Sequence, residues 1–194
     1  MLAVPMTAIF CIGLGLIPAL FGYCYSRWIR DGIAGKTLGF AALWVIFEWL
    51  RGWIFTGFPW LYLGYGHLHT PMAGWSPVIG VYGLSFWVAL SGAALALCLT
   101  APAALKPYGY STLAACLALF GLGFSLQKQE WTLAADTPPL RIGAVQSNIS
   151  QEKKWAYTQY WATLEQYDLA SEELWPDSDL VIWPEAAIPA LYHN

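Results

Sequence analysis

A carboxylate near the end of the sequence occupies a position where acid–base chemistry could take place. Glu185 follows the apolar run 180–183 and Pro184, and most of its neighbours are apolar. Such neighbours would partly desolvate the carboxylate, which suits it to proton transfer, so Glu185 is a candidate general base. A carboxylate that caps the N-terminus of a following helix gives the same pattern. The residues alone favour neither interpretation.

Two further charges lie inside an otherwise apolar stretch. Glu48 and Arg51 are three residues apart, on one face of a helix predicted over 37–55, where mutual pairing would offset the cost of placing charge near lipid. Charges within a membrane are usually functional, whereas charges near a helix end can instead extend toward the lipid headgroups. Both interpretations stay open.

The histidines and cysteines do not indicate a metal site. His67 and His69 form an HxH pattern in an uncharged loop, but the nearby sequence supplies no obvious further ligands. The cysteines are widely spaced, lie in predicted spans and form no CxxC pair, which is typical of small apolar residues. They are Cys11, Cys24, Cys98 and Cys116. We therefore predict no metal ion and no cofactor.

The composition places much of the chain in lipid. Of the 194 residues, 58% are hydrophobic and 11% are charged, against roughly 45–50% and about 25% in an ordinary soluble domain. Residues 1–26, 52–105 and 107–127 carry no charge, and about 20 apolar residues are enough to cross a bilayer. These values exclude a soluble globule.

We predict an α-helical polytopic membrane bundle over residues 1–127. Its four spans are expected at 1–26, 37–55, 78–100 and 108–126. Basic residues fill the first and third connections, so the positive-inside rule places both connections in the cytoplasm and the segment after the fourth span on the outer face. These basic residues are Arg27, Arg30, Lys36 and Lys106.

An uncharged loop rich in glycine, proline and aromatic residues joins the second and third spans. Residues 56–71 read TGFPWLYLGYGHLHTP. Trp and Tyr concentrate at the level of the lipid headgroups, so an aromatic belt at the outer interface is one interpretation. A loop that dips into the membrane to handle lipid is the other, and composition alone favours the belt.

The remaining sequence is typical of a unit that faces water. A linker is expected over 128–139, followed by apolar strands at 140–146 and 180–183 with a helix at 155–174 between them. This order predicts a βαβ unit with parallel strands. Aromatic and apolar residues recur at spacings of three and four along one face of the helix. They are Tyr157, Tyr160, Trp161, Leu164 and Tyr167.

Parallel strands end at the same edge of a sheet, and reactive groups gather beyond that edge. We therefore expect Glu185 to project into the same crevice as the loop at Ser147 and Asn148.

Three motifs, in this order, resemble those of the bacterial apolipoprotein N-acyltransferases. They are EWLRGW at 48–53 with TGFPWL at 56–61, AVQSNI at 144–149 with Lys154 and Trp155, and IWPEAAIP at 182–189. The resemblance covers essentially the whole chain but only the middle of that family's proteins. It implies that residues 140–194 begin an αββα nitrilase-like domain of the carbon–nitrogen hydrolase superfamily. It also implies a location in the bacterial inner membrane, with this domain on the periplasmic side.

The resemblance also implies the last step of lipoprotein maturation. In that family an acyl chain passes from a phospholipid to an enzyme cysteine as a thioester, and then to the amino group of a diacylglyceryl apolipoprotein. The family uses a Glu-Lys-Cys triad, and Glu185 matches its general base. Trp155 matches a tryptophan important for activity, Phe58 and Trp60 match an aromatic loop that contacts lipid, and we group Arg51 with them as substrate-binding residues.

The sequence departs from the family at several positions. Ser147, Ser150 and Ala186 stand where the family usually has Gly, Pro, and Ser or Thr, which leaves the local loop geometry open. The chain ends before the family's Lys and Cys would occur. We therefore expect a central fragment that is inactive by itself.

Two other functions stay open. A membrane-anchored nitrilase-type amidase would share the triad, but a small soluble substrate needs no aromatic loop facing lipid. A transporter fragment is suggested only by the spans and by Glu48 and Arg51, although transport sites lie near the bilayer midplane. The implied partners are a phospholipid acyl donor, a diacylglyceryl apolipoprotein acceptor and the membrane, with no nucleic acid.

Overall fold

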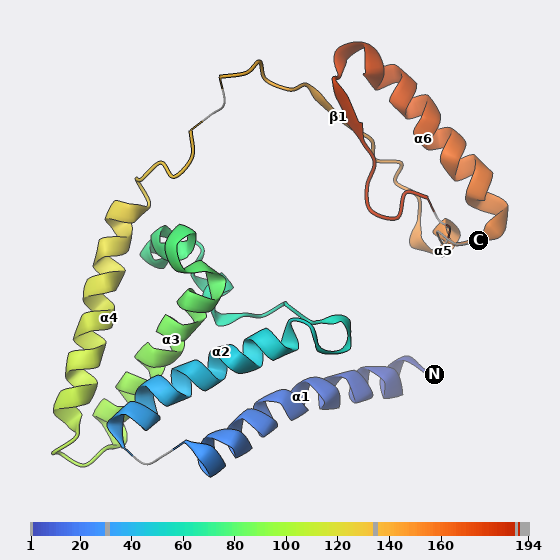
Figure 1. Ribbon diagram of the computed structural model, residues 1–194. Coiled ribbons are helices and arrows are strands. Elements are labelled where there is room, and N and C mark those ends of the chain that lie inside the picture. Colours follow the sequence, from blue (N-terminus) through green and yellow to red (C-terminus); the bar gives the residue numbers. More distant parts are fainter. Residues whose placement is uncertain (1, 30–31, 134–135, 189, 191–194) are drawn as a thin grey trace. The chain divides into compact units, whose positions relative to one another are not determined.

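The computed structural model describes residues 2–29, 32–133, 136–188 and 190 (Figure 1). The chain divides into two compact units, Met1–Leu133 and Ala134–Asn194. The division falls inside the stretch 128–139, where a linker is expected. Each unit is described by itself.

Helices dominate the first unit. The described α-helices are α1 (Ala3–Trp28), α2 (Phe40–Arg51), α3 (Ser76–Thr100) and α4 (Lys106–Leu126). A π-helical turn, η1 (Gly35–Gly39), precedes α2. The 3₁₀ turns η2 (Ile54–Thr56), η3 (Leu63–His67) and η4 (Pro71–Trp75) occupy the segment between α2 and α3.

Three helical stretches in the described part of the chain are long and apolar enough to cross a membrane. They are Ala3–Trp28, Pro71–Thr100 and Lys106–Leu126, and they correspond to three of the four predicted spans. At the fourth predicted position, 37–55, η1 runs directly into α2, and the continuous helical stretch from Gly35 to Arg51 is not among these three. The number of four spans stays a prediction.

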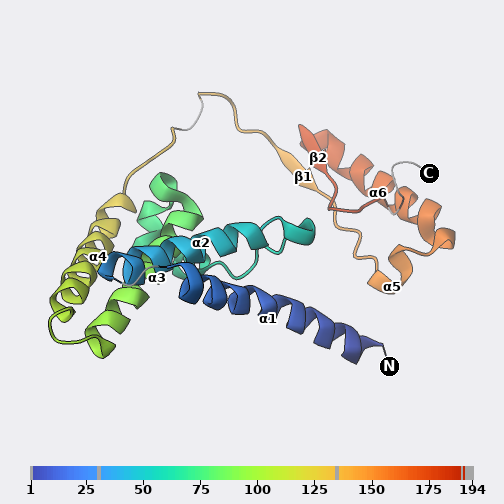
Figure 2. The same ribbon diagram turned by 60° about the horizontal axis from the view of Figure 1, so that its bottom comes forward.

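The helices pack in sequence order, with α1 beside α2, α2 on α3, and α3 beside α4 (Figures 1 and 2). Phe21 of α1 lies edge-on against Phe40 and Trp44 of α2, with ring centroids 5.3 Å apart in both pairs. Between α3 and α4, Trp87 and Cys116 belong to one buried cluster. Most apolar side chains of α1 remain exposed, as expected of a helix that faces lipid.

The second unit contains a small parallel sheet and a helix. Strand β1 (Ile142–Ala144) pairs with β2 (Leu180–Ile182), with Ile142 opposite Leu180. Between the strands lie α5 (Gln151–Lys154), the turn η5 (Tyr157–Gln159), α6 (Tyr160–Leu174) and the turn η6 (Trp175–Asp177). The predicted order of strand, helix and strand and the parallel pairing are therefore confirmed.

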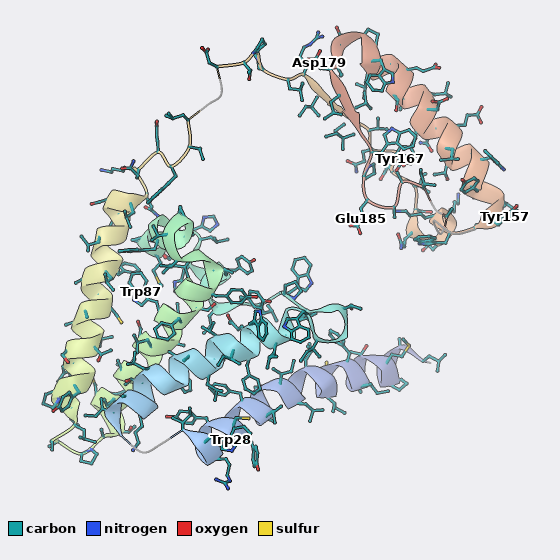
Figure 3. The ribbon with its side chains drawn as sticks, in the orientation of Figure 1. Trp28, Trp87, Tyr157, Tyr167, Asp179 and Glu185 are labelled. Atoms are coloured by element: carbon teal, nitrogen blue, oxygen red, sulfur yellow. The ribbon has the colours of Figure 1, made fainter. Side chains whose placement is uncertain are left out.

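The buried face of α6 differs in part from the predicted one. Tyr167 (Figure 3) is buried, and its ring stacks on that of Trp183, with centroids 5.1 Å apart. Ser171, one turn further, accepts a hydrogen bond from Trp183 Nε1 at 2.8 Å. Tyr157 and Trp161, which we placed on the same face, are 92% and 75% exposed. Tyr157 precedes α6, which begins only at Tyr160 after an extended Ala156. Trp161 lies inside α6, but six residues separate it from Tyr167, which places it about 120° away around the helix.

Candidate functional site

Glu48 is a buried carboxylate that holds the aromatic loop. Its side chain is only 4% exposed. Oε1 accepts hydrogen bonds from Trp44 Nε1 at 3.0 Å and from the main-chain N–H of Leu63 at 2.8 Å. Oε2 is buried without a hydrogen-bond partner among the described residues. The predicted pairing with Arg51 is wrong, because both residues are described and no ion pair joins them.

Arg51 binds the same loop one turn further along α2. Its Nη2 donates to the carbonyl oxygen of Leu61 at 3.1 Å, and its guanidinium carbon lies 5.3 Å from the centroid of the Tyr62 ring. The main-chain N–H of Phe58 donates to the carbonyl of Arg51 at 2.7 Å. The end of α2 therefore fixes the loop at several points between residues 58 and 63.

Close main-chain approaches complete the docking of the loop. Gly64 N–H donates to the fully buried Ser85 Oγ at 2.9 Å, and a Cβ on Gly64 would overlap the carbonyl oxygen of Val81 in α3. Gly57 has φ +87°, and a Cβ there would overlap the carbonyl oxygen of Gly52. The loop is thus seated between α2 and α3 by contacts that only glycine permits.

Tyr62 is a buried residue of the loop. Its side chain is 5% exposed, and its hydroxyl lies 3.4 Å from that of Tyr82. Burial, followed by the hydrogen bond with Tyr82, raises the pKa of Tyr62 to about 12. The phenol therefore stays neutral beside Arg51, and it serves as a ring on which the guanidinium rests.

The two aromatic residues that we assigned to lipid contact lie in different settings. Phe58 is half-buried, and its ring lies edge-on against Phe10 of α1, with centroids 5.8 Å apart. Trp60 is 68% exposed, and the neighbouring Leu61 is 78% exposed with φ +66°. The docked loop therefore presents Trp60 and Leu61 outward, while Phe58 packs against α1.

The histidines of the loop gather no further ligands. Among the residues that the structure describes, no group of three or more His, Cys, Asp or Glu side chains could hold a metal ion. His67 Nδ1 is buried and has no hydrogen-bond partner there.

Glu185 lies in the turn directly after β2 in the second unit (Figure 3). Ala187 N–H donates to the carbonyl of Pro184 at 3.1 Å, and Ala186 has φ +55°, which closes the turn. The carboxylate of Glu185 is exposed. The desolvation that its neighbours suggested is therefore not found in the part of the chain that the structure describes.

The segment before Trp155 lies beside this turn. Lys154 Nζ donates to the main-chain carbonyl of Glu185 at 3.4 Å, and Trp155, the next residue, is 58% exposed. Val145 N–H donates to the carbonyl of Ile182 at 3.0 Å, which extends the pairing toward the carboxyl ends of both strands. Glu185, Lys154 and Trp155 thus lie at one edge of the sheet.

An ion pair at the opposite edge was missed from the sequence. Asp179 Oδ2 accepts from the main-chain N–H of Arg141 at 3.0 Å, and Asp179 Oδ1 lies 3.1 Å from Arg141 Nη2. The hydrogen bonds from the side chain and then the main chain of Arg141 lower the pKa of Asp179. The sequence could have indicated this ion pair, because Arg141 and Asp179 carry opposite charges and directly precede the two paired strands.

Comparisons with known proteins relate more than nine-tenths of the chain to one family. The family model described as "Apolipoprotein N-acyltransferase N-terminal domain" matches residues 1–94. Three relatives are named apolipoprotein N-acyltransferase. The relative from Vibrio vulnificus is 36% identical, and the match covers 91% of this chain and 34% of the relative. The relative from Azotobacter vinelandii is 42% identical, with 96% of this chain and 36% of the relative covered. The relative from Pseudomonas paraeruginosa is 43% identical, with 94% of this chain and 35% of the relative covered. The chain spans about a third of the length of these relatives.

Proposed function

Because the chain belongs to the apolipoprotein N-acyltransferase family, we propose that it forms part of an enzyme that completes lipoprotein maturation. The enzyme transfers a fatty acyl chain from a phospholipid to the α-amino group of a diacylglyceryl cysteine in an apolipoprotein. It lies in the bacterial inner membrane, with the unit that contains Glu185 on the periplasmic side as the beginning of a nitrilase-like domain.

The observation that carries this proposal is the docked loop of the first unit. A chain with long apolar helices meets lipid in any case, but here two charged side chains and a buried serine fix one loop whose tip exposes Trp60 and Leu61. Aromatic side chains of this kind favour the boundary between lipid and water. The loop is suited to contact the phospholipid that donates the acyl chain, and Arg51 holds the loop through the carbonyl of Leu61.

Glu185 is the proposed general base. It removes the proton from a cysteine thiol, and the thiolate attacks the ester carbonyl of the phospholipid. The C–O bond then breaks, and the lysophospholipid leaves with a proton while the acyl chain remains as a thioester. In the second half of the reaction the amine of the apolipoprotein attacks the thioester and releases the thiol. An exposed carboxylate at the carboxyl ends of parallel strands is accessible to such a thiol.

In this proposal the nucleophilic cysteine and the lysine that stabilises the oxyanion belong to the part of the enzyme that corresponds to the unmatched two thirds of the relatives. The described cysteines all belong to the first unit, where Cys24, Cys98 and Cys116 are buried. We therefore expect the chain of 194 residues to show no acyl transfer by itself.

A chimera tests the proposal. In the Azotobacter vinelandii relative, the segment that aligns with this chain over 191 residues is replaced by the chain itself. We expect transfer of a labelled fatty acid from phosphatidylethanolamine to a diacylglyceryl peptide, with a labelled thioester as intermediate. Glu185→Gln should abolish the thioester, because the thiol then has no base. Glu165→Gln, a change of an exposed carboxylate on α6, is the matched control.

Two outcomes would contradict the proposal. A folded chimera that transfers no acyl chain would contradict the proposed acyltransferase function. A chimera with Glu185→Gln that still accumulates the labelled thioester would remove the role of Glu185 as base.

A further inference from the structure

A cavity of about 460 Å³ lies between α2 and α3, away from the docked loop tip. On the α2 side it is lined by the rings of Phe40 and Trp44, and on the α3 side by small residues that include Gly92 and Ala96. A Cβ added to Gly92 would meet no atom within 4 Å. Large rings opposite small side chains therefore leave a channel that the described chain does not fill.

The length of this channel fits one acyl chain. Its lining on α3 runs from Val88 to Thr100, which corresponds to about 18 Å at the rise of an α-helix. Half of the hydrocarbon core of a bilayer measures roughly 15 Å. The channel is therefore as long as the apolar part of one lipid leaflet.

One end of the channel is polar. Lys36 and Thr100 line this end, next to the connections of α1 with α2 and of α3 with α4. Among the described residues, three basic side chains and no acidic one lie beside these connections. They are Arg27 at the end of α1, Lys36 in η1 and Lys106 at the start of α4. Anionic lipid headgroups are attracted to basic clusters of this kind at the membrane surface.

We propose that this cavity is a binding site for an anionic phospholipid. The headgroup phosphate lies at Lys36, and one acyl chain lies along the small residues of α3. The Lys36 end of the site lies before α2, whereas Arg51 lies at the end of α2, so the proposal does not rest on the acyltransferase function. The cavity reaches Leu63, whose N–H is held by Glu48. A bound lipid would therefore also stabilise the seat of the loop.

Native mass spectrometry of the full chain in detergent tests the site. Phosphatidylglycerol and phosphatidylcholine with identical acyl chains are titrated separately, and the lipids retained per protein are counted. We expect tighter retention of one phosphatidylglycerol. Lys36→Gln should weaken its binding about fivefold, the effect of one basic residue near an anionic headgroup, and should weaken that of phosphatidylcholine less, because its choline cation offsets the phosphate charge. Lys106→Gln, a change at the same end but outside the cavity lining, should alter binding less than twofold.

A second variant fills the channel without a change in charge. Ala93 also lines the cavity, and Ala93→Phe should abolish the retention of phosphatidylglycerol while the circular-dichroism spectrum of this variant stays that of the unchanged chain. The proposal is overturned if the two lipids are retained equally. It is also overturned if Lys36→Gln and Lys106→Gln have equal effects, if Ala93→Phe retains the lipid, or if a second copy of the chain occupies the cavity and appears as a dimer free of lipid.

Discussion

Replacement of Glu48 by alanine should release the loop from α2. The carboxylate receives two hydrogen bonds through one oxygen, from Trp44 and from the main chain of Leu63. Alanine removes this acceptor and leaves two part-buried N–H groups without it. Glutamine keeps a carbonyl oxygen at the position of Oε1, and it changes only the oxygen that has no hydrogen-bond partner among the described residues.

The size of the effect follows from these two bonds. A hydrogen bond to a charged group contributes about 1.5–3 kcal/mol, so Glu48→Ala should lower the free energy of unfolding by roughly 3–6 kcal/mol. Total stabilities are about 5–15 kcal/mol, so the loss is large. Glu48→Gln should stay within about 1 kcal/mol of the unchanged chain, because burial of a carboxylate is itself unfavourable.

Hydrogen exchange at individual amides separates loop release from global unfolding. In Glu48→Ala the amide of Leu63 should exchange roughly 10- to 150-fold faster, as expected for the loss of about 1.5–3 kcal/mol. The amide of Cys116, inside α4, is the internal reference for global unfolding. Unchanged exchange at Leu63 in Glu48→Ala, or equal acceleration in Glu48→Gln, would refute the anchoring role of Glu48.

Two further predictions concern the seat of the loop and the edge of the sheet. Gly64→Ala should destabilise the first unit by about 1–3 kcal/mol in thermal unfolding, because its Cβ would overlap the Val81 carbonyl, whereas Gly66→Ala has open space and should be neutral. Arg141→Gln should raise the pKa of Asp179 in a carboxyl NMR titration, and an unchanged value would contradict the ion pair. Since the pKa of Asp179 is lowered in the folded chain, the pair stabilises the sheet above the unfolded pKa and is lost as the pH falls through the folded pKa. The effect should be small, because both side chains are exposed.

Much of the architecture could be predicted because its signals are local. Uncharged stretches longer than 20 residues predicted three helices that the structure contains. Apolar runs on both sides of a helical segment predicted the parallel pairing of β1 with β2. Each of these signals depends on a hydrophobic pattern within one short window, which the sequence states directly.

The partners of Glu48 could not be predicted in this way. The spacing of three to Arg51 suggested a pair within the helix, and the structure instead gives both side chains main-chain partners in the loop. Nearly every residue carries a main-chain N–H and C=O group, so residue types in the sequence do not show which of these groups a side chain binds. The exposed position of Glu185 escaped prediction for a similar reason, because apolar neighbours in the chain do not determine which atoms surround a turn.

These partners also bear on the choice between lipid handling and transport. A transport pathway needs charged side chains that face a route for the solute. In the described part of the first unit, Glu48 Oε1 and Arg51 Nη2 are bonded to the main chain of the loop, and Glu48 is 4% exposed. The two charges hold the loop in place, and the loop exposes its apolar tip at Trp60 and Leu61. Because both charges fix a loop with an apolar tip, this arrangement supports the proposed contact with lipid over the conduction of a solute.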